Sequence, residues 1–226
     1  MLFDRDNNLE KSSKEFNCDK KEYFNNKKGK LRNGSYFTKW YNFYFDAIRH
    51  RDMNVLEIGI AYGESVKMWK NFFFNSEIYG VDIKEKDFQT DQLEGVNVFI
   101  GDQGDTIFLK NICNKVPDGF DIIIDDGSHI TNDQVISFEY LFRRLNHGGI
   151  YVIEDVHTSY VKKFKKKPHK SLIDYLKKRI DDVNVGGRLG RYTKQDILSL
   201  PSLNPYEEMI ESIHFYPDIC FVLKKE

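Results

Sequence analysis

Four carboxylates and a histidine directly follow two apolar segments of the sequence. They are Asp125, Asp126 and His129 after the segment 120–124, and Glu154 and Asp155 after the segment 148–153. If these segments are neighbouring strands, the five side chains converge, and buried carboxylates repel one another unless a cation or protons compensate for their charge. Oxygen ligands of this kind suit Mg²⁺, with Mn²⁺ or Ca²⁺ as alternatives. The pattern therefore predicts a divalent-cation site.

A cation site next to a histidine can activate an alcohol. An alcohol hydroxyl has a pKa near that of water and is a poor nucleophile at neutral pH, but a bound divalent cation lowers this pKa by several units. His129, with an intrinsic pKa of about 6.5, can then take the proton. The remaining requirement is an electrophile held in line with the hydroxyl oxygen, at a distance of roughly 3 Å.

Three earlier predicted strands end in a glycine turn or in an acidic residue. These ends are the ExGxxxG turn from Glu57 to Gly63, then Asp82, then Asp102. A glycine turn lets a ligand approach the backbone, and an acidic residue about 20 positions later can accept the ribose hydroxyls of an adenosine. The turn lacks one glycine of GxGxxG, which weakens the case for a dinucleotide. With Asp102 available to the adenine amino group, the combination fits S-adenosylmethionine better than NAD.

Short apolar strands alternate with helices along the middle of the chain. Strands are predicted at 54–58, 77–82, 97–100, 120–124 and 148–153, with helices at 64–74, 105–114 and 131–145. Apolar strands separated by helices indicate a parallel sheet that is covered on both faces. A closing hairpin is predicted in SIHFYPDICFVLKK. In such a sheet ligands bind beyond the carboxyl ends of the strands, where the polar residues above fall.

Composition favours a single globular domain. The chain has 226 residues, of which 40% are hydrophobic and 31% charged, and its net charge of −1 gives no field to attract nucleic acid. No apolar run is long enough to cross a bilayer, and the first residues hold no apolar signal core. The three cysteines lack metal-ligand spacing. These features predict a cytoplasmic protein with neither a membrane span nor a nucleic-acid partner.

The domain organisation predicted from the sequence has three parts. Residues 1–34 are polar and form an N-terminal extension or cap, and 35–226 form one catalytic domain. The stretch 156–205 interrupts the alternation of strands and helices and is predicted to form a lid. It holds six lysines that are either a solvated face or a clamp for a phosphorylated ligand: Lys162, Lys163, Lys165, Lys166, Lys167 and Lys170.

An aromatic helix is expected at 36–48, with Trp40, Tyr44 and Ile48 along one face. Such a stripe is more often part of a core than a ligand platform. An interface of a homo-oligomer explains it equally well, so the sequence leaves the oligomeric state open.

Five segments together resemble one enzyme family. VLEIGIAYGESVKMW, YGVDI, GDQGD, DIIIDDGSH and GGIYVIEDVHTSY are similar to the mycinamicin-type sugar O-methyltransferases, Mg²⁺-dependent class I enzymes that use S-adenosylmethionine. The resemblance covers about residues 31–160 and the terminal hairpin. It implies a Rossmann-like class I methyltransferase, an α/β fold with a mostly parallel seven-stranded sheet, helices on both faces and a C-terminal antiparallel hairpin.

The resemblance also implies roles for individual residues. Asp126, Glu154 and Asp155 would bind the metal, with His129 as general base and Asp126 contributing to catalysis. The cofactor would be held by nine residues at the strand ends: Glu57, Gly59, Tyr62, Gly63, Ser65, Asp82, Asp102, Gln103 and Asp125. Tyr160 and Lys163 would contact the acceptor.

Two departures from the family bear on the acceptor. Members often carry a histidine before the aromatic helix, where this chain has Ser35-Tyr36-Phe37-Thr38. The additional N-terminal domain of the macrolide enzymes is also missing from the sequence, which argues against a whole macrolide as the acceptor. Together with the lysine-rich stretch, this favours a nucleotide-diphosphate sugar used for a surface polysaccharide.

Three other functions remain open at the level of the sequence. A catechol-type O-methyltransferase also uses a divalent cation beside the sulfonium. An NAD-dependent sugar dehydrogenase or epimerase would share the early strands, but it would want GxGxxG and usually Tyr-x-x-x-Lys, and Phe164 stands four residues after Tyr160. A non-catalytic binder of the cofactor or of a glycan precursor would not require a base beside a metal.

Overall fold

The computed structural model describes residues 8–20, 37–85, 93–189 and 205–226. The chain divides into two compact units, Met1–Gly101 and Asp102–Glu226. Most of the predicted extension, together with Ser35 and Tyr36, lies outside the described residues. Among the residues that are described, no helix has both the length and the apolar character needed to cross a membrane.

The first unit holds three parallel strands in the order β3-β2-β1. They are β1 (Asn54–Ile58), β2 (Glu77–Asp82) and β3 (Val96–Ile100). Val55 pairs with Ile78, and Val81 with Phe99, so the strands run in register toward one common edge. Three helices accompany them: α1 (Asn8–Glu15), α2 (Phe37–Phe45) and α3 (Glu64–Phe72). Helix α1 contacts both α2 and α3.

The aromatic helix α2 supplies core, as predicted, but through a different face. Tyr41 and Phe45 are fully buried, and each packs against Trp69 with its ring centroid 5.0 and 6.2 Å away. The predicted stripe of Trp40, Tyr44 and Ile48 is only half-buried. Both sets have helical spacing, so the period of the pattern cannot tell which of two adjacent aromatic faces turns inward.

The second unit contains four strands in the order β4-β5-β7-β6. They are β4 (Phe120–Asp125), β5 (Leu145–Glu154), β6 (Ile210–Tyr216) and β7 (Ile219–Lys224). Strands β4 and β5 are parallel, whereas β7 is antiparallel to both β5 and β6. The predicted seven strands and the C-terminal antiparallel hairpin are confirmed, and the mostly parallel α/β architecture with them.

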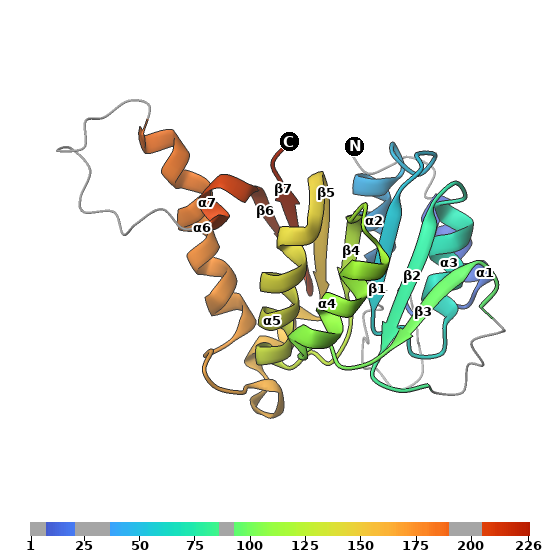
Figure 1. Ribbon diagram of the computed structural model, residues 1–226, viewed down its shortest axis with the longest axis horizontal. Helices are drawn as coiled ribbons and strands as arrows, with labels where there is room; N and C mark the ends of the chain where they lie inside the picture. Colours follow the sequence, from blue (N-terminus) through green and yellow to red (C-terminus); the bar gives the residue numbers. More distant parts are fainter. Residues whose placement is uncertain (1–7, 21–36, 86–92, 190–204) are drawn as a thin grey trace, which may run out of the picture. The chain divides into compact units, whose positions relative to one another are not determined.

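Four α-helices and three short 3₁₀ helices are described in the second unit. The α-helices are α4 (Thr106–Lys115), α5 (Thr131–Leu141), α6 (Leu172–Leu189) and α7 (Pro205–Met209). Short 3₁₀ helices are η2 (Phe142–Arg144), η3 (Val156–Tyr160) and η4 (Lys162–Phe164). Helix α5 contacts α4 on one side and α6 on the other (Figure 1). The predicted helix 131–145 is divided, because its last residues form η2 and the beginning of β5.

A buried ion pair ties the N-terminal segment to the end of β1. The Nζ atom of Lys20 lies 3.3 Å from Oε1 of Glu57, and both side chains are at least 98% buried. The second carboxylate oxygen, Oε2, accepts a hydrogen bond of 2.5 Å from Ser65 at the start of α3. A carboxylate buried this deeply needs such partners, because an unpaired buried charge costs several kcal/mol.

We therefore expect Lys20→Met to lower the free energy of unfolding by about 3 kcal/mol, since it leaves the Glu57 carboxylate buried without its cation. Urea denaturation followed by circular dichroism measures the loss. The double variant Lys20→Met/Glu57→Gln should recover part of it. Lys14→Met is the control: Lys14 is an exposed lysine of α1 paired with Glu10, and its loss should cost less than about 0.5 kcal/mol. Equal stability of Lys20→Met and the wild type would contradict the expectation.

Candidate functional site

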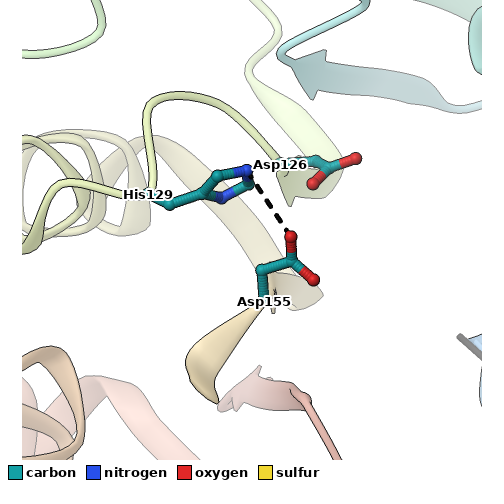
Figure 2. Close-up of side chains that lie close together, drawn as sticks. All are labelled: Asp126, His129 and Asp155. Carbon is teal, nitrogen blue, oxygen red and sulfur yellow. Dashed lines mark ion pairs between the residues drawn. The ribbon is translucent and has the colours of Figure 1, made fainter. Parts of the chain in front are cut away.

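Asp126, His129 and Asp155 lie close together in the second unit, and Figure 2 shows the imidazole of His129 facing the carboxylate of Asp155. Each offers a possible ligand atom, and these atoms all lie within 4.8 Å of one another. The Nε2 atom of His129 is 3.5 Å from Oδ2 of Asp155. All three residues are half-buried, so the group is open to a ligand while being partly screened from water.

Glu154, the third predicted metal ligand, lies near Asp126. One of its carboxylate oxygens is within 4.8 Å of a carboxylate oxygen of Asp126, and its side chain is 2% exposed. Asp126 therefore lies near both other predicted ligands, Asp155 with His129 in one group and Glu154 in the other. The carboxylates of these residues offer the oxygen ligands that a hard divalent cation such as Mg²⁺ or Mn²⁺ prefers.

The backbone is bent sharply at two of these residues. His129 has a φ angle of +56° and Asp155 one of +53°, in the left-handed region that non-glycine residues rarely occupy. Holding a non-glycine residue in this backbone conformation costs on the order of 1 kcal/mol, and such residues tend to occur at functional sites. At Asp155 the turn is held by Thr158, whose backbone N–H and hydroxyl both donate to the Asp155 carbonyl, at 2.9 and 2.7 Å.

Two of the predicted cofactor residues, Gln103 and Asp125, belong to a buried polar network. The Nε2 atom of Gln103 donates to Oδ1 of Asp125 at 3.0 Å, and Ser137 and Tyr151 donate to Oδ2 at 2.6 and 3.1 Å. Burial raises the pKa of Asp125 above the usual aspartate value, and the hydrogen bonds from Ser137, Gln103 and Tyr151 act in the opposite direction. Each of these side chains is at least 95% buried.

In the first unit, the predicted cofactor turn has the left-handed backbone conformation that glycine allows. Gly59 and Gly63 have φ angles of +88° and +85°, and a Cβ atom on Gly63 would meet Leu93 at 2.7 Å. Oδ2 of Asp82 accepts from the N–H of Ala61 at 3.0 Å, so the carboxylate predicted to bind ribose also holds the turn. Tyr62 points outward, with 58% of its surface exposed.

The other predicted residues at these strand ends differ in exposure. Asp102 is exposed, and its Oδ1 accepts from the N–H of Gly104 at 2.7 Å. Glu57 and Ser65 are buried against each other and against Lys20. Lys20 was missed by the sequence analysis, since one lysine in a polar segment 37 residues before its partner leaves no periodic or motif signal.

The predicted acceptor residues lie on η3 and η4, directly after the metal-binding candidates. Tyr160 is 74% exposed, and Lys163 is exposed with its Nζ 4.4 Å from the centre of the Phe164 ring. The Phe164 ring and the imidazole of His129 stand nearly perpendicular to each other, with 6.1 Å between the ring centroids. The lysine-bearing segment 162–170 is therefore in contact, through Phe164, with His129, the candidate base.

His157, which the sequence analysis did not select, stands beside the same site. Its Nδ1 atom lies 3.9 Å from Oδ1 of Asp155 and 3.4 Å from Oδ1 of Asp218. It also borders a mainly apolar cavity of about 400 Å³ that includes Tyr160 and Phe215. His157 belongs to GGIYVIEDVHTSY, one of the segments that carry the family resemblance, and it follows the end of β5. This position is the sequence signal by which it could have been selected.

Comparison with known proteins places these residues in a family context. The chain is 33% identical over 202 residues to the 8-demethyl-8-alpha-L-rhamnosyl tetracenomycin-C 2'-O-methyltransferase of Streptomyces olivaceus, covering 84% of this chain and 50% of that protein. It is 35% identical over 216 residues to the mycinamicin VI 2''-O-methyltransferase of Micromonospora griseorubida, covering 89% of this chain and 50% of that protein. The chain thus spans about half the length of these curated relatives.

A solved structure shares the fold. The MycE methyltransferase from the mycinamycin biosynthetic pathway, in complex with Mg and SAH, matches with a TM-score of 0.79 and 31% identity, over 98% of this chain and 55% of that chain. A family model described as FtsJ-like methyltransferase matches residues 38–186. That match covers more than half of the chain, which therefore belongs to the FtsJ-like methyltransferase family.

Proposed function

We propose that this protein transfers the methyl group of S-adenosylmethionine to a hydroxyl group of a sugar, with the help of Mg²⁺ or Mn²⁺. The observation that carries the proposal is the convergence of Asp126, His129 and Asp155 after the ends of β4 and β5 (Figure 2). Glu154 lies near Asp126. The names of the curated relatives, which are sugar O-methyltransferases, support the same reaction. MycE was solved with Mg and SAH, which supports the cofactor and the metal.

In this proposal Asp126, Glu154 and Asp155 hold the cation, and His129 is the general base. When bound, the cation lowers the pKa of the acceptor hydroxyl. His129 takes the hydroxyl proton, and the nearby Asp155 carboxylate stabilises the imidazolium that results. The sulfonium carries the methyl group, so the methyl–sulfur bond breaks as the methyl–oxygen bond forms and S-adenosylhomocysteine leaves.

The cofactor residues of the proposal lie at the strand ends described above. Gly59 and Gly63 allow a ligand to approach the turn closely, and Asp82 presents a carboxylate there for the ribose. The remaining proposed cofactor residues are Glu57, Tyr62, Ser65, Asp102, Gln103 and Asp125.

The proposed acceptor is a nucleotide-diphosphate sugar used for a surface polysaccharide, methylated in the cytoplasm. Its support is the lysine-bearing segment, since all six lysines between 162 and 170 are exposed and Phe164 joins the segment to His129. Ammonium groups in such a position can bind a diphosphate while the sugar reaches the base. We also propose that 156–205 acts as the lid of a domain 35–226, with 1–34 as its extension, because η3, η4 and α6 all follow the end of β5.

Calorimetric titration tests the cofactor without knowledge of the acceptor. We expect micromolar binding of S-adenosylhomocysteine and no binding of NAD. Binding of NAD alone would instead support a dehydrogenase or epimerase. With radiolabelled S-adenosylmethionine and Mg²⁺, methyl transfer to sugars should stop when EDTA is added. Methylation of catechols but not of sugars would favour the catechol-type alternative.

His129→Ala should lower kcat by about 10²-fold or more, since it removes the general base, and should leave binding of S-adenosylhomocysteine unchanged. His147→Ala is the matched control, because His147 is an exposed histidine at the opposite end of β5. Steady-state kinetics with Mg²⁺ at saturation compares the two variants. A wild-type kcat in His129→Ala would eliminate this residue as the base.

Alanine substitution of Lys163, Lys165, Lys166 and Lys167 should raise the KM for a nucleotide sugar at least about tenfold, because charge-assisted hydrogen bonds to the diphosphate are lost. Lys110→Ala/Lys115→Ala provides a control with exposed lysines of α4. Initial-rate measurements at varied acceptor concentration give both KM values. Unchanged kinetics of the four-lysine variant would remove the support for a phosphorylated acceptor.

A further inference from the structure

The loop that bears His129 is held by its contacts rather than by its own conformational preference. His129 stands in the left-handed region at φ +56°, so this backbone needs fixed partners on either side. One anchor is Ser128, whose hydroxyl donates to Oδ2 of Asp133 at 3.0 Å and accepts from the N–H of Ile130 at 3.1 Å. These bonds tie the loop to the first turn of α5.

A second anchor comes from a distant part of the chain. The backbone N–H of Ser128 donates to Oε1 of Gln103 at 2.6 Å, across 25 residues of sequence. The other end of the same amide, Nε2, donates to Oδ1 of Asp125 at 3.0 Å and to Oγ of Ser137 at 3.2 Å. Gln103 thus uses both ends of its amide within the protein, and it is 5% exposed.

The anchoring carboxylate is itself fixed. Asp125 is fully buried at the end of β4, and Ser137 on α5 and Tyr151 on β5 donate to its second oxygen. A buried carboxylate that accepts hydrogen bonds from three side chains is fixed in its orientation. It also forces the orientation of Gln103, because a flipped amide would place a carbonyl oxygen against the carboxylate.

We propose that Gln103 is a positioning residue for His129, which it holds in place by clamping the loop of Ser128 to the buried Asp125. This inference rests on the proposed function and refines it, because it replaces the cofactor contact assigned above to Gln103 and Asp125 with the task of positioning the base. A small displacement of a catalytic group reduces the rate far more than it reduces cofactor binding. The clamp therefore controls turnover.

Two variants test the clamp. Gln103→Leu removes both ends of the amide at similar volume, and Ser137→Ala removes a donor to Asp125 from α5. Both should lower kcat by about tenfold or more, with the Kd for S-adenosylhomocysteine changed less than about twofold. The control is Asn146→Leu. It removes a side-chain hydrogen bond of 3.0 Å that Asn146 donates to Oδ1 of Asp121, near the opposite ends of β4 and β5. It should leave kcat unchanged.

A second readout needs no substrate. Nuclear magnetic resonance of ¹³C-labelled histidine should show a shifted ring resonance for His129 in Gln103→Leu and in Ser137→Ala, with the resonance of His147 unmoved. Circular dichroism confirms that each variant is folded. These spectra support the clamp even if the wild type methylates no sugar, in which case only the proposed function fails.

Two results would overturn the inference. One is a rise of tenfold or more in the Kd for S-adenosylhomocysteine with kcat retained at saturating cofactor, since that identifies Gln103 as a cofactor contact. The other is a folded pair of variants with wild-type kcat and an unmoved His129 resonance, which shows that the loop keeps its position without the clamp.

Discussion

The parallel pairing of β4 with β5 is the constraint on which the candidate site depends. Asp125 pairs with Ile153, so the next residues along the chain, Asp126 and Glu154, follow this pair at the same level. Two chain segments that each end in acidic residues are thereby forced together, against the repulsion of their charges. A shift of register by one residue would move the acidic end of one strand by about 3.3 Å along the other and separate the carboxylates.

The protein buries two further carboxylates at strand ends and neutralises them in different ways. Glu57 has an ammonium partner, Lys20, whereas Asp125 accepts bonds from the neutral side chains of Gln103, Ser137 and Tyr151. An ion pair adds a strong but costly interaction, because both charges must lose their water. A set of neutral donors instead fixes the geometry of Asp125 without adding a positive charge next to Asp126.

Much of this architecture could be predicted from local sequence. Strands β1, β2 and β4 begin at the predicted residues. The acidic residues at strand ends could be selected as candidates, since ligands of a parallel sheet bind beyond the carboxyl ends of its strands. The inward face of α2 could not be predicted, since two adjacent aromatic stripes have the same period. Nor could the partners of Lys20 and Gln103 be predicted, because these pairs join residues 37 and 22 positions apart, and no local pattern records such a contact.

The ring of Phe164 contacts both the Lys163 ammonium and the imidazole of His129. One aromatic side chain therefore links an exposed lysine to a half-buried histidine. Under the proposed function, a loop that is lengthened or shortened to accommodate a different acceptor would also change what packs against the imidazole of His129. Acceptor binding and the surroundings of the proposed base would then be linked through Phe164.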